Sequence, residues 1–289
     1  MHQHRHFNLL LYDDDELEPF VQGSIVERVT LHEWPLSCVQ RLTTSDGRRI
    51  VYKAQFGPTV ESQFYANAKS DLLISGRTIY QSDGYIGMLL EFVEAPLVEN
   101  LDLSEGEIAR IGRTVTTRIA EITGDLPCFI DVSTEEKWAT LVEGMLSSLN
   151  RLVSQGAFNR VSAETIRKLE CWSLCEPVLS AVCLNPGYAH QDLGSDNIFV
   201  SSDGYRVIDW QRPILGPPDL DMATLLETSG VDPFAYVDES IVWIMHLLRI
   251  HWSVQCAMQW FPQGRTAYDE QIVRLASLIG VSRSGGHGS

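Results

Sequence analysis

Lysine is scarce in this chain. Only four lysines occur among 289 residues, and 22 basic side chains face 38 acidic ones, which gives a formal net charge of -16. Phosphate recognition on nucleic acids needs a basic face, so the charge balance argues against a nucleic-acid partner. An acidic surface keeps a protein soluble, and it would also suit a cationic small-molecule substrate. Charge alone leaves these two interpretations open.

Paired cysteines and uninterrupted apolar runs are also lacking. The six cysteines show no CxxC pairing and no metal-ligand spacing, which favours a reduced, cytoplasmic location. The longest apolar stretch, residues 240–261, carries His246, Arg249 and His251, so it predicts a buried helix and not a membrane span. We therefore expect a cytoplasmic protein without a membrane partner.

The first twenty residues offer little apolar sequence. They contain too short an apolar run for a secretory signal. Three histidines, His2, His4 and His6, are expected to lie in a frayed tail, and residues 13–18 are expected to form a solvated acidic run.

Strand signals dominate the next seventy residues. Runs rich in β-formers at 24–31 and 37–44 are followed, across an Asp-Gly turn, by a third at 50–55. A helix is predicted over 58–73, where apolar residues recur every four positions, and two further strands at 77–82 and 85–95 flank a second Asp-Gly turn. The pattern predicts an antiparallel sheet with one helix across it.

Helical patterns dominate beyond Pro96. Ser104 with Glu107 and Ser133 with Glu136 have capping-box spacing, and a further helix is predicted over 163–182. Residues 187–213 interrupt this pattern with two short strands around a third Asp-Gly turn, and helices resume at Met222. The predicted fold class is α+β and bilobal, with an N-terminal lobe at 1–93 and a mostly helical lobe at 94–289.

Two carboxylates and one amide cluster around the predicted hairpin. Asp192 and Asn197 lie five residues apart in a loop that enters the first strand, and Asp209 follows the second strand. Such oxygen ligands suit Mg²⁺, which substrate phosphates usually complete. In phosphoryl transfer to a hydroxyl, one Asp orients the attacking group while another Asp and an Asn hold the metal ions. The pattern is typical of this reaction.

A lysine inside a strand supplies the positive partner that phosphates need. Lys53 lies in the apolar run "IVYKAQ", where its ammonium is costly unless paired. Strand alternation places Val51 on the same face, where it could pack on a nucleotide base while Lys53 reaches the phosphates. Glu61, at the start of the next helix, is the expected partner. The alternative is a surface lysine on an edge strand and a glutamate favoured by a helix N-terminus.

These residues match a known pattern in order along the chain. The segments "HQDLGSDNIFV", "VIDWQRP" and "GPPDLDMATLL" closely resemble the catalytic core of the aminoglycoside phosphotransferase and choline-kinase-like superfamily, whose fold is that of protein kinases. The resemblance implies that Asp192 is the catalytic base, braced by His190. It also implies that Asn197 and Asp209 hold Mg²⁺ and that Lys53, paired with Glu61, binds the phosphates of ATP or GTP.

The resemblance extends to the adenine site and the support of the loop. It implies that backbone groups of Glu91 and Val93, with Phe92 between them, hold the base, and that Asp221 supports the catalytic loop. There are two departures. Residues 31–38 contain no glycine where protein kinases have a glycine-rich loop, and Asp209 is followed by Trp210 and Gln211.

The acceptor is harder to predict than the reaction. Asp221 follows Asp209 by only twelve positions, which leaves no room for the activation segment of a protein kinase and favours a small hydroxylated acceptor. An aminoglycoside-like antibiotic is the leading candidate, which would make the protein a resistance factor. Alternatives are choline, ethanolamine, fructosamine, homoserine or sugar acceptors, or a catalytically silent nucleotide-binding homologue. The oligomeric state stays open.

Seven acidic side chains of the second lobe could attract a cationic acceptor. Helix caps and solvated helix faces are nonetheless the more ordinary roles for such residues. The seven are Asp131, Glu135, Glu136, Glu227, Asp232, Asp238 and Glu239.

Overall fold

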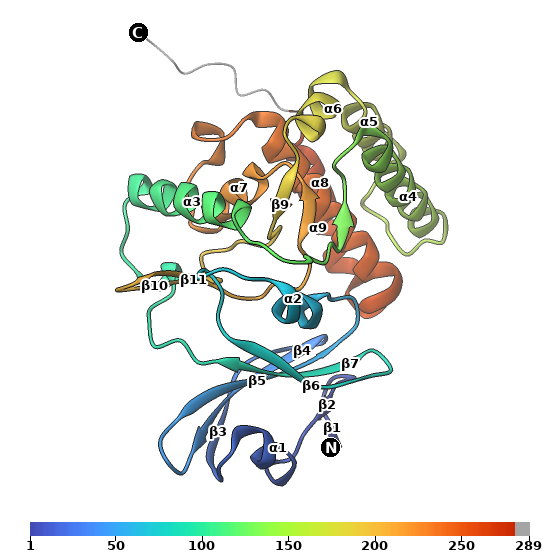
Figure 1. Ribbon diagram of the computed structural model, residues 1–289. Helices are drawn as coiled ribbons and strands as arrows, with labels where there is room; N and C mark the ends of the chain where they lie inside the picture. Colours follow the sequence, from blue (N-terminus) through green and yellow to red (C-terminus); the bar gives the residue numbers. More distant parts are fainter. Residues whose placement is uncertain (281–289) are drawn as a thin grey trace. The chain divides into compact units, whose positions relative to one another are not determined.

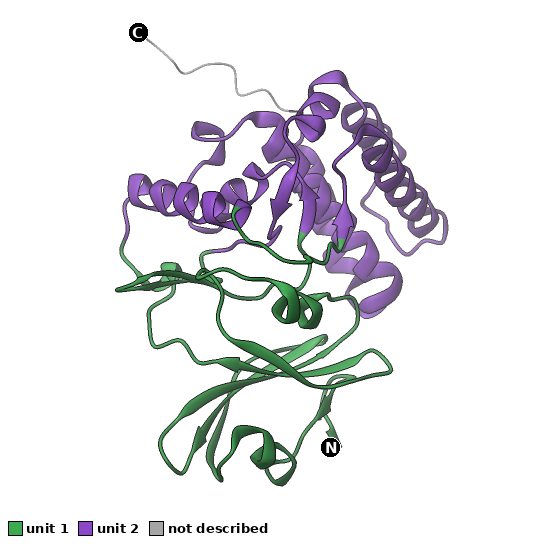
Figure 2. Cartoon of the chain, in the orientation of Figure 1, with its two compact units in different colours: residues 1–102, 121–129, 195–213 green, residues 103–120, 130–194, 214–289 purple. Residues whose placement is uncertain are grey.

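The chain folds into two compact units, each assembled from separate stretches of sequence. The structure, a computed structural model, describes residues 1–280. Unit 1 comprises residues 1–102, 121–129 and 195–213, and unit 2 comprises 103–120, 130–194 and the chain from 214 onward (Figure 2). An antiparallel sheet forms the main part of unit 1 and helices form most of unit 2, which confirms the predicted α+β class.

A five-stranded antiparallel sheet organises unit 1 (Figure 1). The hairpins predicted at the Asp-Gly pairs are present, with Gly47 and Gly84 at φ values of 84° and 83° that glycine adopts without strain. β5, which carries Lys53, is the central strand. In spatial order the strands are β3 (Ile25–Trp34), β4 (Ser37–Thr44), β5 (Arg49–Phe56), β7 (Tyr85–Glu91) and β6 (Gly76–Ser82).

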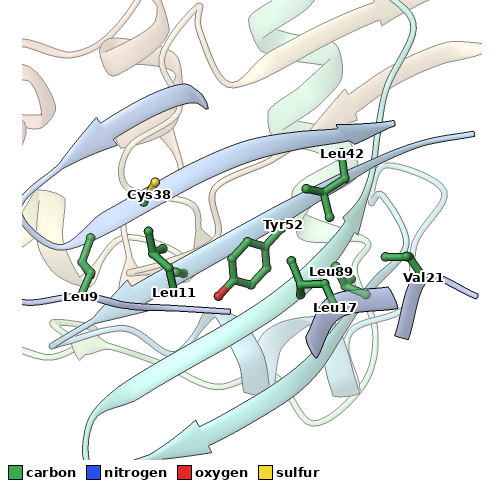
Figure 3. Close-up of a cluster of buried hydrophobic side chains, with 9 residues drawn as sticks. Leu9, Leu11, Leu17, Val21, Cys38, Leu42, Tyr52 and Leu89 are labelled. Carbon is green, nitrogen blue, oxygen red and sulfur yellow. The ribbon is translucent and has the colours of Figure 1, made fainter. Parts of the chain in front are cut away.

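The N-terminal segment covers one face of this sheet. β1 (His2–Gln3) pairs with β2 (Leu10–Leu11), and α1 (Asp14–Val21) follows. Leucines and a valine from this segment pack with Tyr52, Leu42 and Leu89 of the sheet (Figure 3). The Tyr12 amide N–H donates to the Tyr52 hydroxyl at 3.0 Å. The buried side chains of Leu17 and Val21 form the face of α1 that packs against the sheet.

The expectation of a frayed tail is therefore wrong, whereas the acidic run is solvated as expected, with the side chains of Asp13, Asp14 and Glu16 56%, 47% and 37% exposed. The His4 ring stacks on Phe7 with ring centroids 5.1 Å apart, and its Nδ1 accepts the amide N–H of His6 and of Phe7. The acidic run supplies the first turn of α1, where the helix dipole favours negative charge.

The other face of the sheet carries α2 (Glu61–Asn67), which is much shorter than the predicted helix over 58–73. The chain is extended at Ala68, with φ -73° and ψ 143°. Beyond it, Lys69 pairs with Thr123, and a Cβ added to Gly124 would collide with the Asn67 carbonyl. These long-range contacts end the helix although the apolar spacing of four continues.

The hairpin that carries Asn197 and Asp209 at its open end belongs to unit 1. β10 (Ile198–Ser201) pairs with β11 (Gly204–Val207), and bridges from Leu97 to Phe199 and from Leu73 to Val207 attach the hairpin to the rest of the unit. The 3₁₀ turn η1 (Val98–Asn100) lies beside it. The sequence had placed this segment in the second lobe, because chain order does not reveal bridges to residues 73 and 97.

Unit 2 combines helices with a three-stranded sheet of order β8-β12-β9. The predicted helix over 163–182 is broken at Leu174 into α5 and α6. Ser104 and Glu107 form the predicted capping box, whereas the next long helix is capped by Thr134, because Ser133 instead donates to Asp131. The sheet contains β8 (Ile130–Asp131), β12 (Ile214–Gly216) and β9 (Gly187–Ala189).

Seven α-helices complete the described part of unit 2. The apolar stretch 240–261 forms α8 and a following π-helix, and within residues 1–280 no helix is long and apolar enough to cross a membrane. The α-helices are α3 (Glu105–Ala120), α4 (Glu135–Ser154), α5 (Ala163–Ser173), α6 (Glu176–Cys183), α7 (Asp219–Thr228), α8 (Glu239–Gln255) and α9 (Arg265–Leu278). Short helical turns are η2 (Pro233–Ala235), η3 (Cys256–Trp260) and η4 (Pro262–Gly264).

The packing of the N-terminal segment can be tested through Cys38, which lies in the buried cluster of Figure 3. Burial, with a contribution from the Glu33 charge, raises the pKa of the Cys38 thiol to about 11. Because the thiolate is the reactive form, we expect iodoacetamide at pH 8 to alkylate the exposed Cys171 and Cys183 and to spare Cys38 until the protein is unfolded in urea. Peptide mass spectrometry measures each rate. Equal rates at Cys38 and Cys171 in the folded protein would contradict the docking of this segment.

Candidate active site

Lys53 lies in a cluster of three charged side chains, of which Lys53 and Glu61 are buried and Asp209 is partly exposed. Its Nζ is 2.7 Å from Oε2 of Glu61 and 2.5 Å from Oδ1 of Asp209. The Lys53 side chain is 5% exposed and that of Glu61 is fully buried. A surface lysine on an edge strand is therefore excluded, since β5 is central and the ammonium is enclosed. The structure brings Lys53 and Glu61 together as expected and adds Asp209 as a direct partner.

With both carboxyl groups ionised, the cluster holds one negative charge in excess; burial raises the pKa of Glu61, and the charge of Lys53 opposes this shift. Burial alone would lower the pKa of Lys53, but the charges of Asp209 and Glu61 outweigh it and raise that pKa, so the ammonium stays protonated. The amide of Gln55 donates to Oε2 of Glu61 at 2.7 Å. One ammonium thus faces two carboxylates, and the surplus favours a further cation beside Asp209, the more exposed of the two.

Asp209 is fixed by the residues that follow it. Its φ of 68° is in the left-handed region, which is uncommon for residues other than glycine. The Trp210 ring is buried and stacks on Phe64 of α2 with centroids 4.3 Å apart, and its indole N–H donates to the Val207 carbonyl. The Val60 amide donates to the Gln211 carbonyl at 3.0 Å. The unusual Trp-Gln pair thus ties Asp209 to the helix that carries Glu61.

Asn197 lies at the same end of the hairpin as Asp209. The register pairs Ile198 with Val207, and the Ile208 amide donates to the Asn197 carbonyl at 3.1 Å. The Asp209 carboxylate and the Asn197 amide oxygen are hard ligands. The excess negative charge of the Lys53 cluster lies at Asp209. This donor set fits Mg²⁺.

The residues predicted to hold the nucleotide's adenine ring differ in what they contact. Val51 and Val93 both pack against one cluster of buried side chains, on the sheet face that also carries Lys53. The Glu91 amide donates to the Ser75 carbonyl, and the Phe92 ring lies under the guanidinium of Arg49. Within residues 1–280 the Val93 N–H makes no hydrogen bond. Of the two amides in question, that of Val93 is the one open to a ligand.

In unit 2, the loop after β9 is held by a buried carboxylate. Oδ2 of Asp221 accepts the His190 amide and Oδ1 accepts the Gln191 amide, both at 2.7 Å. The Asp192 amide donates to Nδ1 of His190 at 3.3 Å. Gln191 takes a φ of 74°, and the Asp192 side chain that follows is exposed. The loop therefore presents Asp192 on a fixed backbone.

Solved structures share this architecture along nearly the whole chain. No protein-family model and no curated protein matches the sequence. A choline/ethanolamine kinase family protein from Mesorhizobium loti is 14% identical, with a TM-score of 0.62 over 92% of each chain. Spectinomycin phosphotransferase, solved with ADP and spectinomycin, is 12% identical, with a TM-score of 0.55 over 93% of this chain and 98% of its own. A structure with GDP and kanamycin bound is 12% identical, with a TM-score of 0.58 over 90% of this chain and 95% of its own.

The chain has the fold of the aminoglycoside phosphotransferase and choline-kinase-like superfamily. The resemblance inferred from the motifs is confirmed at this level. It covers the strand-rich and the helix-rich parts alike.

Four of the seven acidic residues considered for a cationic acceptor have local partners within this fold. Asp131 forms an ion pair with Lys137 at 2.6 Å, and Asp232 and Asp238 cap η2 and α8 by accepting backbone N–H groups. Glu227 is bound by His246 and Arg249. Nothing in the sequence pointed to this last cluster, because His246 and Arg249 lie 19 and 22 residues after Glu227, on another helix.

Removing the ammonium at the centre of the charged cluster should destabilise unit 1. Lys53→Met leaves Glu61 buried without its cation, so we expect the free energy of unfolding in urea to fall by about 3 kcal/mol. The double variant Lys53→Met/Glu61→Gln should recover part of this loss, because no buried charge remains unpaired. If Lys53→Met were as stable as the wild type, the enclosed ion pair would be contradicted.

The carboxylate that holds the His190 loop should make stability depend on pH. Burial raises the pKa of Asp221 from 3.8 to about 6, against the opposing effects of His190 and two backbone N–H groups. The folded state therefore binds this proton more tightly than the unfolded state. The stability that it contributes is full below pH 3.8 and is lost as pH rises through 6, by about 3 kcal/mol.

The Asp221→Asn variant, which cannot ionise, isolates this contribution. We expect the wild type to lose about 2 kcal/mol of unfolding free energy relative to the variant between pH 4 and pH 7, which urea unfolding of both proteins at the two pH values measures. The hydrogen bond that asparagine cannot make is a constant offset at both pH values. A difference that is independent of pH would contradict the buried, shifted carboxyl.

Proposed function

We propose that the protein is a small-molecule kinase that transfers the γ-phosphoryl group of ATP or GTP to a hydroxyl group of its acceptor. The observation that carries the proposal is the charged cluster of Lys53, Glu61 and Asp209, which lies in a fold shared with phosphotransferases. A lysine held by one carboxylate and placed beside a second one suits a triphosphate with a bound metal ion. The similar solved structures contain ADP in one case and GDP in another, so both ATP and GTP remain candidate phosphoryl donors.

The nucleotide-binding roles follow from the contacts in unit 1. Lys53 would donate to phosphate oxygens while Glu61 keeps its ammonium in place. Val51 and Val93, which pack on one cluster, would lie against the base, and the Val93 N–H would donate to it. Asn197 and Asp209 would hold Mg²⁺, which when bound neutralises charge on the β- and γ-phosphates.

The acceptor roles follow from the loop in unit 2. The carboxylate of Asp192 would accept the proton of the acceptor hydroxyl, or orient that hydroxyl, in line with the γ-phosphorus. The backbone bonds from His190 and Gln191 to Asp221 restrict the loop, which lowers the entropy lost when the hydroxyl is aligned.

The acceptor is proposed to be a small hydroxylated molecule. The segment between Asp209 and Asp221 contains β12 and the start of α7, which leaves no stretch for a peptide-binding platform. Neighbours that bind spectinomycin and kanamycin are consistent with an antibiotic acceptor and a role in resistance, and the choline/ethanolamine kinase family protein is consistent with a metabolite. The competing proposal is a nucleotide-binding homologue without turnover.

Two substitutions test the reaction. Asp192→Asn and Asp209→Asn should each lower kcat by about 10³-fold or more, since one removes the base and the other a metal ligand. Transfer is measured by mass spectrometry as a gain of about 80 Da on acceptors offered with ATP or GTP and Mg²⁺. Asp203→Asn, at the exposed tip of the β10–β11 hairpin, is the matched control and should keep full activity.

Nucleotide binding, measured beside transfer, separates the kinase from a binding-only homologue. Thermal shift should show that Asp192→Asn still binds ADP, whereas Asp209→Asn loses the part of the stabilisation that depends on Mg²⁺. Full activity in either variant would refute the assigned chemistry. Mg²⁺-dependent nucleotide binding without transfer to any acceptor would favour the binding-only protein.

A further inference from the structure

Three side chains of α7 and α8 form a polar cluster that the proposed chemistry does not use. Nε2 of His246 is 2.8 Å from Oε1 of Glu227, and Nη1 of Arg249 donates to Oε2 of the same carboxylate. The His246 side chain is 3% exposed, whereas those of Arg249 and Glu227 are 30% and 32% exposed. The cluster thus has a buried side at His246 and a solvent-facing side at the ion pair.

The carboxylate of Glu227 is neutralised within this cluster. A carboxylate only accepts hydrogen bonds, so Nε2 of His246 carries the proton that it donates. Burial, with the charge of Arg274, lowers the pKa of His246 to about 4, and the imidazole is neutral at physiological pH. The positive charge opposite Glu227 is therefore that of Arg249. A cationic acceptor would have to compete with this guanidinium for the carboxylate.

Arg249 keeps most of its hydrogen-bonding capacity. The guanidinium has five N–H donors, and the bond to Glu227 is the only one that its side chain makes within residues 1–280. Burial and the charge of Arg274 lower the pKa of Arg249, while the charge of Asp192 raises it. Asp221 of α7 holds the loop from which Asp192 projects, and Glu227, six residues later on the same helix, holds Arg249. The loop and the guanidinium are therefore anchored on one helix, and the guanidinium still has free donors.

We propose that Arg249 binds a carboxylate of the acceptor molecule whose hydroxyl Asp192 orients. This inference rests on the kinase function proposed above and names the class of its acceptor. A planar guanidinium matches a carboxylate through two parallel hydrogen bonds, and Glu227 with His246 holds it in position. An acceptor with an ammonium near its hydroxyl would instead meet the positive charges of Arg249 and Arg274. The acceptor is a hydroxy acid, and polycationic antibiotics and small amino alcohols are disfavoured.

Three probe compounds of equal length test the proposal, because they differ only in their end group. 4-Hydroxybutyrate carries a carboxylate, 4-hydroxybutyramide is neutral, and 4-amino-1-butanol is a cation. With nucleotide and Mg²⁺, we expect kcat/KM for the carboxylate to exceed that for the amide by about tenfold or more, with the amine lowest.

Arg249→Gln should remove this preference. We expect kcat/KM for 4-hydroxybutyrate to fall by about 10–100-fold, mainly through KM, while the value for the amide changes little. Arg249→Lys keeps the charge but loses the fork, so it should be intermediate, and it serves as the second variant if Arg249→Gln folds poorly. Arg160→Gln removes an exposed arginine of unit 2 and should leave the preference intact.

The outcomes separate this inference from the function on which it rests. Preference for the amine, or a carboxylate preference that Arg249→Gln leaves unchanged, overturns the role of Arg249 and leaves the kinase in place. A protein that binds ADP but is neither stabilised by 4-hydroxybutyrate in thermal shift nor able to phosphorylate it also overturns this role. Failure to bind ADP or GDP with Mg²⁺ counts against the kinase itself.

Discussion

The ammonium of Lys53 lies between two carboxylates, and much of unit 1 is organised around that arrangement. A buried ammonium is tolerated only with its partners in place, so β5, α2 and the turn after β11 must come together as one assembly. The sheet supplies a rigid central strand, and α2 supplies Glu61 from its first turn. Asp209 completes the cluster and leaves the excess negative charge that a metal ion would balance.

The aromatic stack behind Asp209 serves the same assembly. Phe64 lies on α2 one turn beyond Glu61, and Trp210 directly follows Asp209, so the stacked rings join the two segments that carry the carboxylates. The hydrogen bond from Val60 to Gln211 joins them a second time. In unit 2, Asp221 fixes the His190 loop in a similar way by accepting two hydrogen bonds from backbone N–H groups. In both units, a buried contact fixes the backbone next to an aspartate whose side chain is at least partly exposed.

The features that were predicted from sequence are those set by local pattern or by strong chemical exclusion. The Asp-Gly hairpins follow from turn chemistry. A lysine in an apolar strand requires an anion, for which Glu61, in the first turns of the following helix, was the candidate. Long-range contacts escaped this reasoning. The early end of α2 depends on residues 123 and 124, and the placement of the β10–β11 hairpin depends on bridges to residues 73 and 97. The cluster of Glu227, His246 and Arg249 depends on how two helices pack, which periodicity does not encode.

The left-handed backbone at Asp209 bears on how such a protein changes over evolutionary time. Asparagine and glycine are the residues that adopt this conformation most readily, so either could replace Asp209 with little conformational strain. Either would also relieve the surplus of negative charge around Lys53. Either would, however, remove the stronger of the two charges that keep the Lys53 ammonium protonated, so stability also bears on this position. A descendant in which Glu61 alone held the ammonium would keep the backbone conformation at residue 209 while losing part of the assembly around Lys53.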